Sequence, residues 1–214
     1  ILKMAKTAYF GLLFLSFLFP LEFVVEPYLQ SATQSSIYIL WETDSNSDSR
    51  VEWGTTTSLG KITTGTAITS YGSNKIHTVQ LTGLHTSTRY YYRAVTGSLT
   101  SEIYDFIAPP DPISESSFKI VAMSDMQKDW GNYNKFEEIV HQGIISYLSD
   151  QYSDDLPGEL QMVLIPGDLV DTGSNYSHWT DHFFAPSTAL FAHVPIYPVL
   201  GNHEANTGYY FNYF

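Results

Sequence analysis

The feature that most constrains the fold of this 214-residue chain is a pattern repeated in its second half, in which a short apolar run ends in polar residues. The three runs are 118–123, 162–165 and 196–200. Runs of this length are typical of buried strands, and helical spacing of apolar residues lies between them. Strands that alternate with helices predict a layered α/β domain. In an open α/β sheet, ligands bind at the loops that follow the carboxyl ends of the strands.

Each run is followed by side chains that can bind a cation. They are Asp125 after the first run, Asp168 after the second, and Asn202, His203 and Glu204 after the third. Carboxylate, amide and imidazole groups suit hard or borderline cations. The chain has no cysteine, so a metal ligand must be an oxygen or a nitrogen atom. Taken alone, Asp125 and Asp168 are each also typical of a cap on the following turn or helix, and His203 of a hydrogen-bonded packing residue. Only the recurrence of such residues at three strand ends predicts a site.

Residues 23–109 have a different pattern, in which short alternating strands are separated by clusters of Ser, Thr, Gly and Asn. This spacing predicts an antiparallel β-sandwich of about 85 residues. In the stretch 84–90, a Leu and a turn precede Tyr90, which predicts a tyrosine corner whose hydroxyl bonds back to the backbone. Residues 110–117 begin with a Pro-rich segment and are expected to link the sandwich to an α/β domain at 118–214.

Composition and the N-terminus restrict the class of function. The net charge of −12 argues against a nucleic-acid partner, because phosphate backbones require a basic surface. Lys6 precedes an uncharged apolar run at residues 8–19, which is too short to span a membrane. We therefore predict a signal peptide at residues 1–22 and a secreted or periplasmic protein. A membrane partner is expected only in the alternative case, in which this segment stays uncleaved as an anchor.

Three motifs follow one another in the chain: Asp125-x-Gln127, Gly167-Asp168-x-x-Asp171 and Gly201-Asn202-His203-Glu204. Their order and spacing resemble the first three blocks of the calcineurin-like metallophosphoesterases. With the β-rich segment in front, which opens with Glu26-Pro27-Tyr28-Leu29-Gln30, the chain most resembles the purple acid phosphatases. The resemblance implies a mixed fold, namely an all-β fibronectin type III-like sandwich followed by the first half of an α/β layered metallophosphoesterase domain.

The resemblance also implies an acid phosphatase-like enzyme that hydrolyses phosphate monoesters of small molecules at a two-metal site. Asp168 would bridge the two cations, Asp125 would bind the first and Asn202 the second. The expected metals are Fe, Zn, Mn or Mg, which would activate a water molecule and neutralise phosphoryl charge. His203 would stabilise the phosphoryl oxygens or protonate the leaving group, with Glu204 orienting it.

Three departures from the family pattern limit this expectation. Gln127 stands where many metallophosphoesterases have a His, and Asp171 stands where the coloured enzymes have a Tyr, so we expect a colourless centre. The later His-containing blocks have no counterpart after Glu204, so the chain reads as a fragment that is inactive by itself. Two other functions remain open: a phosphodiesterase or nucleotidase, and a non-catalytic extracellular binding module with a degenerate phosphoesterase domain.

Overall fold

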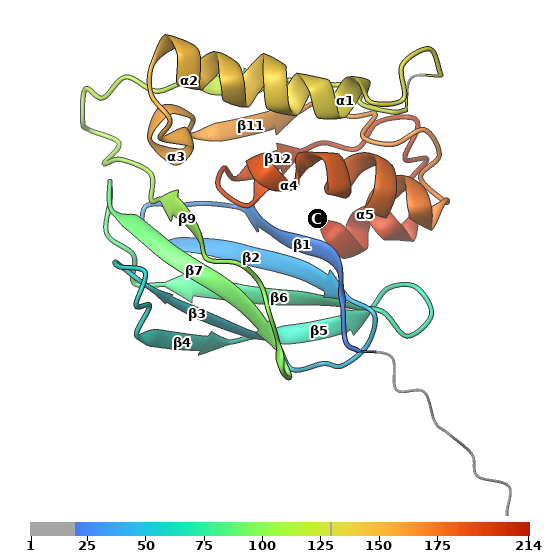
Figure 1. The fold of residues 1–214 in the computed structure, drawn as a ribbon, viewed down its shortest axis with the longest axis horizontal. Coiled ribbons are helices and arrows are strands. Elements are labelled where there is room, and N and C mark those ends of the chain that lie inside the picture. The colour runs from blue at the N-terminus through green and yellow to red at the C-terminus, as the bar shows by residue number, and fades with distance from the viewer. Residues whose placement is uncertain (1–19, 129) are drawn as a thin grey trace, which may run out of the picture.

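The computed structural model describes residues 20–128 and 130–214 (Figure 1). The predicted signal peptide at 1–22 therefore lies outside the described residues except for its last three positions. Among the residues that are described, no helix is both long enough and apolar enough to cross a membrane.

The N-terminal half is the predicted β-sandwich, drawn in blue to green in Figure 1. Its strands are β1 (Phe23–Gln30), β2 (Ser36–Thr43), β3 (Arg50–Gly54), β4 (Lys61–Thr64), β5 (Thr66–Thr69), β6 (Lys75–Thr82), β7 (Arg89–Thr96), β8 (Leu99–Thr100) and β9 (Tyr104–Ile107). Strands β1, β2, β6 and β5 pair antiparallel in one sheet, and β4, β3 and β7 pair in the other, with β8 and β9 both bonded to β7.

The alternating residues of the sandwich form its core, as the period-2 pattern requires. Ile37, Ile39 and Trp41 are at most 1% exposed, and the indole N–H of Trp41 donates to the Thr96 hydroxyl on the opposite sheet at 2.9 Å. The Tyr90 hydroxyl accepts a hydrogen bond from the backbone N–H of His85 at 2.9 Å. The predicted tyrosine corner is thereby confirmed.

The C-terminal half alternates strands and helices. Its elements are β10 (Ile120–Ala122), α1 (Lys135–Glu138), η1 (Ile139–Ser146), α2 (Tyr147–Gln151), α3 (Leu156–Glu159), β11 (Met162–Ile165), η2 (His178–Phe184), α4 (Ala185–Phe191), β12 (Ile196–Pro198) and α5 (Gly208–Tyr213). The strands pair in parallel in the order β10-β11-β12, with Val121 opposite Val163 and Val163 opposite Ile196. Their carboxyl ends consequently lie at one edge of the sheet.

The apolar residues of 176–193, with Pro186 among them, predict a helix that breaks near the proline, and this prediction is wrong. The π-helix η2 runs directly into α4, since both Phe184 and Ala185 have right-handed helical backbone angles. Pro186 lies in the first turn of α4, where the hydrogen bonding changes from π to α spacing. A proline is tolerated in the first turn of an α-helix, where its missing N–H and fixed φ angle fit the helix, so the chain passes it without a break.

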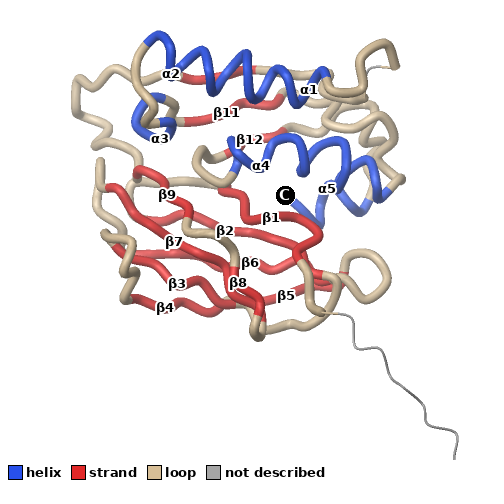
Figure 2. Tube along the Cα trace, in the orientation of Figure 1, coloured by secondary structure: helices blue, strands red, loops and turns tan. Residues whose placement is uncertain are grey.

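The two halves share one sheet, which the sequence pattern did not predict. Strand β12 pairs in parallel with β1, with Gln30 opposite Ile196, so a single sheet runs in the order β10-β11-β12-β1-β2-β6-β5 (Figure 2). Residues 110–117 pass outside this sheet as a connection. The domain limits at 109 and 118 stay a prediction, because the hydrogen-bonded sheet itself continues across them.

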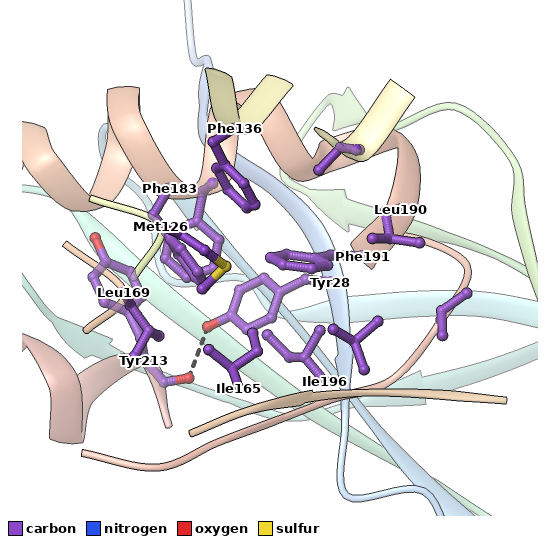
Figure 3. Packing of buried hydrophobic residues seen from close by; sticks show 14 of the residues in the cluster. Tyr28, Met126, Phe136, Ile165, Leu169, Phe183, Leu190, Phe191, Ile196 and Tyr213 are labelled. Carbon is purple, nitrogen blue, oxygen red and sulfur yellow. Dashed lines mark hydrogen bonds between the residues drawn. The ribbon is translucent and has the colours of Figure 1, made fainter. Parts of the chain in front are cut away.

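The core of the α/β half also contains residues of the sandwich. Tyr28 of β1 is 1% exposed and lies among Ile165, Phe191 and Ile196 in Figure 3. Its hydroxyl donates to the backbone carbonyl of Tyr213 at 2.9 Å, the dashed contact of Figure 3. The two halves are therefore held together by a common apolar core and not only by the connecting segment.

A buried carboxylate strengthens the same junction. Glu42 of β2 is fully buried and accepts hydrogen bonds from the hydroxyl groups of Tyr213 at 2.6 Å, Tyr176 at 2.8 Å and Ser70. The nearby negative charge adds to the effect of burial and raises the pKa of both tyrosines above their ordinary value. Both tyrosines consequently remain protonated donors, and they fix α5 and the segment before η2 against the sandwich.

Candidate metal centre

The loops that follow β10, β11 and β12 contact one another directly. The backbone N–H of Met126 donates to the carbonyl of Asp168 at 3.0 Å, which joins the first loop to the second. The backbone N–H of His203 donates to Oδ1 of Asp168 at 3.1 Å, which joins the second loop to the third. Asp168 thus lies between the segments that carry Asp125 and Asn202.

Both aspartates have backbone angles that non-glycine residues seldom adopt. The φ angle is 55° at Asp125 and 53° at Asp168, in the left-handed region, and it is 100° at Gly167. Asp tolerates this region better than most residues, because its short side chain can hydrogen-bond locally. The buried side chain of Met126, which points into the core in Figure 3, anchors the first loop next to exposed Asp125. Such conformations persist only where the surroundings hold them, and they concentrate at functional sites.

Glu204 holds the second and third loops together. Its side chain is fully buried. One carboxylate oxygen accepts from the N–H groups of Leu169 at 2.8 Å and Val170 at 3.2 Å, and the other from those of Asp168 at 3.1 Å and Gly201 at 2.7 Å. A buried carboxylate is tolerated only with such compensation, because an unpaired charge away from water is very costly.

Two glycines allow this close approach of backbones. A Cβ atom on Gly201 would lie 2.2 Å from the backbone nitrogen of Asp168, and one on Gly173 would lie 2.3 Å from the carbonyl oxygen of Glu204. Neither distance is compatible with a side chain, so glycine is required at both positions. Gly173 was not among the predicted site residues, although it lies only two residues after Asp171.

The imidazole of His203 is oriented by a backbone carbonyl. Its Nδ1 atom lies 2.8 Å from the carbonyl oxygen of Asp171, and because a carbonyl can only accept, Nδ1 carries the proton and Nε2 faces away from this bond. The hydrogen bond raises the pKa of His203 above its ordinary value, and the carboxylates of Asp168 and Asp171 act in the same direction. The sequence-based hypothesis gave the orienting role to Glu204, whereas the carboxylate of Glu204 accepts hydrogen bonds from backbone N–H groups.

The side chains expected to hold metals differ in their surroundings. Asp125 and Asn202 are exposed, Asp168 is half-buried, and the Ser124 hydroxyl donates to Oδ2 of Asp125 at 2.5 Å. The Oε1 atom of Gln127 is buried and has no hydrogen-bond partner among the described residues. Buried polar atoms normally have hydrogen-bond partners. The unpaired Oε1 atom of Gln127, two residues after Asp125, is therefore consistent with a sheet edge that receives a cation or a hydrogen-bond donor.

The oxygen and nitrogen atoms at this edge are of the types that bind metal ions, but they form only part of a coordination shell. Carboxylate and amide oxygens with a nearby imidazole suit Mg, Mn, Fe or Zn. Over the ranges 20–128 and 130–214, however, no group of three or more His, Cys, Asp or Glu side chains is placed to hold one ion. The histidines of η2 belong to no such group among the described residues. Nδ1 of His178 accepts the N–H of Thr172, and its ring lies tilted against that of His182 with centroids 4.8 Å apart.

Comparison with known proteins agrees with this architecture. Residues 25–108 match the family model "Purple acid Phosphatase, N-terminal domain", and residues 118–214 match the model "Calcineurin-like phosphoesterase". The structure of purple acid phosphatase PPD1 from seeds of yellow lupin (Lupinus luteus) is similar with a TM-score of 0.66 and 24% identity, over 83% of this chain and 35% of that chain.

A structure of PhoD is similar with a TM-score of 0.55 and 14% identity, over 85% of this chain and 39% of that chain. The chain thus spans little more than a third of the length of each of these two proteins. A search of curated protein sequences found no significant match.

These findings confirm the fold class expected from the sequence, a β-sandwich followed by a partial α/β metallophosphoesterase domain. Calcineurin-like phosphoesterases are hydrolases that use dinuclear metal centres, which agrees with the chemical class of the donors at the sheet edge. The chain therefore carries a segment similar to a purple acid phosphatase N-terminal domain, followed by a segment similar to a calcineurin-like phosphoesterase domain.

Proposed function

We propose that this protein is a metal-dependent phosphomonoesterase whose reaction takes place at the carboxyl edge of β10, β11 and β12. The position of Asp168 carries the proposal. Its carbonyl accepts the N–H of Met126 and its carboxylate accepts the N–H of His203, so it lies between the loops of Asp125 and Asn202. A bridging carboxylate in a two-metal site requires this central position.

In this proposal Asp125, Asp168 and Asn202 hold the cations. When bound, a pair of cations supplies an activated water and neutralises the charge of the phosphoryl group. Asp168 is half-buried and has one oxygen fixed by the N–H of His203, so its carboxylate is pre-oriented before any cation arrives. Pre-orientation matters because a ligand that is already positioned needs no reorganisation when the ion binds.

His203 is proposed to act on the substrate. Because Nδ1 donates to the carbonyl of Asp171, the Nε2 atom is left to donate a proton to the leaving oxygen or a hydrogen bond to the phosphoryl oxygens. Glu204 is a positioning residue, since it holds the N–H groups of Asp168 and Gly201. The hydrogen bonds of Glu204 fix the distance between the loop that carries Asp168 and the loop that carries His203.

Two further parts of the proposal concern the chain as a whole. We propose that the described chain does not turn over phosphate esters by itself, because its donors form only part of a metal shell. We also propose that the protein is exported, since the basic residue and apolar run at residues 6–19 are typical of a signal peptide. A fusion of residues 1–22 to a reporter enzyme that is active only after export tests the second point.

Activity on p-nitrophenyl phosphate, compared with its bis-ester, tests the function. The test uses a protein that also supplies the later His-containing blocks. A chelator is used to remove its metal ions, and we expect nitrophenol to be released once Mn, Zn, Fe or Mg is added back, faster from the monoester than from the bis-ester. Asp168→Asn is expected to lower kcat by about 100-fold or more, and His203→Ala by a similar factor. Retention of turnover by folded Asp168→Asn would refute the assignment, and preference for the bis-ester would favour a phosphodiesterase.

A non-catalytic binding module is the second candidate, and the incomplete metal group among the described residues favours it. Calorimetric titration with Mn²⁺ or Zn²⁺ separates the two. The enzyme proposal predicts binding that Asp168→Asn weakens, whereas a degenerate module predicts no dependence on Asp168.

A further inference from the structure

A cavity of about 370 Å³ lies between the loop that follows β10, the helix α1 and the middle of the η2–α4 helix. The residues that line it include Met126, Gln127, Lys128, Tyr133, Phe136 and His182. A smaller cavity of about 50 Å³ is lined by Asp125 and shares Met126, Gln127 and Phe136 with the larger one. The larger cavity therefore adjoins the candidate metal centre on the side of Asp125.

Two exposed aromatic side chains stand on the loop that borders this cavity. Trp130 is 72% exposed and Tyr133 is 58% exposed, and their rings contact edge to face with centroids 5.8 Å apart. The ammonium group of Lys128 lies 4.6 Å from the centre of the Tyr133 ring. Large aromatic rings contribute most to stability when buried, so a neighbouring pair left in water beside a cavity points to a surface on which a ligand stacks.

The cavity wall also contains two polar atoms that lack partners. Among the described residues, neither Oε1 of Gln127 nor Nδ1 of His182 has a hydrogen-bond partner, although both atoms are buried. Nε2 of His182 lies 3.5 Å from the ammonium of Lys128, which can only donate, so the proton of the neutral imidazole resides on Nδ1. Burial and the neighbouring charge of Lys128 lower the pKa of His182, which favours this neutral form. The wall thus contains one unpaired acceptor and one unpaired donor.

The charges around the cavity disfavour an anionic ligand. Asp181 and Glu137 line it together with Lys128, so one ammonium group faces two carboxylates. The volume lies within the range of small-molecule sites, which is roughly 300–1,000 Å³. A neutral, flat group with a hydrogen-bonding edge fits these surroundings: its faces would contact the aromatic pair and its edge would meet Gln127 and His182 after a side-chain rotation.

We propose that this cavity is the leaving-group site and that it takes a planar aromatic ring that bears hydrogen-bonding nitrogen or oxygen atoms. Its role as a leaving-group site rests on the proposed phosphoesterase function, because the phosphoryl group would then face Asp125. The binding of the ring itself requires neither metal nor hydrolysis. The site can therefore be tested separately from the reaction.

Trp130 provides the measurement. Of the four tryptophans, all of which lie in the described ranges, Trp41, Trp53 and Trp179 are at most 4% exposed, so a change in fluorescence on ligand addition reports on Trp130. Titration with adenosine, an uncharged aromatic probe, is expected to give saturable quenching, and titration with ribose none. Benzoate, which is aromatic but anionic, is expected to bind more weakly than adenosine.

Variants of the exposed tyrosines assign the effect. Tyr133→Ala is expected to weaken adenosine binding by about tenfold or more, because stacking of one base on an aromatic side chain is typically worth this factor. Gln127→Leu is expected to weaken it as well. Tyr147→Ala is the matched control, since Tyr147 is 55% exposed but belongs to α2 and does not line the cavity.

The absence of saturable quenching by adenosine, or equal affinities of the Tyr133 and Tyr147 variants, would overturn the proposal. In an active enzyme, Tyr133→Ala is expected to lower kcat/KM for adenosine 5′-phosphate but to leave that for glycerol phosphate unchanged, and an equal loss on both substrates would exclude a leaving-group site. If a protein that also supplies the later His-containing blocks binds adenosine but has no phosphatase activity, the proposed function is refuted while the aromatic site stands.

Discussion

Replacing Glu204 with glutamine is expected to destabilise the fold strongly, although the two side chains have nearly the same shape. The carboxylate is fully buried and each of its oxygens accepts two backbone N–H groups. An amide has one oxygen and one NH₂ group. Whichever way the amide of glutamine turns, its NH₂ group faces two N–H donors and two hydrogen bonds are lost.

The magnitude follows from these contacts. A hydrogen bond to a charged group contributes about 1.5–3 kcal/mol, so the loss of two bonds lowers the free energy of unfolding by about 3–6 kcal/mol. Donors that remain buried and unpaired keep the loss toward the upper end of this range. Such a change is a large fraction of the total stability of a domain, which is about 5–15 kcal/mol.

Urea unfolding followed by circular dichroism measures the difference, with Glu159→Gln as the control. Glu159 pairs with Lys119 at 2.7 Å near the surface, so its replacement is expected to leave the free energy of unfolding almost unchanged. If Glu204→Gln is too unstable to purify, Glu204→Asp retains the charge and withdraws the oxygens, and an intermediate loss is expected. A Glu204→Gln protein as stable as the control would refute the role assigned to this carboxylate.

Three further predictions concern the sandwich and the glycine contacts. Burial lowers the pKa of His77 from 6.5 to about 4, so between these pH values only the unfolded chain binds the proton. The free energy of unfolding should therefore be at its full value above pH 6.5 and fall by up to about 3 kcal/mol as the pH drops to 4. Urea titrations at several pH values should show that His77→Gln removes this pH dependence and that His85→Gln, at an exposed position, does not. Tyr90→Phe leaves the N–H of His85 without its acceptor and is expected to cost about 1–3 kcal/mol in urea unfolding, and no measurable cost would contradict the corner. Gly173→Ala places a Cβ 2.3 Å from the Glu204 carbonyl oxygen, so we expect a lower melting temperature and a loss of at least about 1–3 kcal/mol, whereas a neutral effect would mean that the loops do not touch.

The sequence by itself determined the local elements and the positions of the candidate ligands. Period-2 alternation fixed which residues of the sandwich face inward, since Ile37, Ile39 and Trp41 are buried as that period requires. The three apolar runs fixed the strands, although β10 begins two residues later than the run and leaves Phe118 63% exposed. These features are local, because the period of a strand is set by the residues of that strand alone.

Only the tertiary structure decided which partners these residues have. The pairing of β12 with β1 joins residues 166 positions apart, and nothing within either strand specifies it. For the same reason the sequence could place Glu204 next to His203 but could not show that its carboxylate binds the loop of Asp168, or that the Asp171 carbonyl orients the imidazole. Hydrogen bonds between loops depend on how the strands are ordered in the sheet, and that order is set by the packing of the whole core.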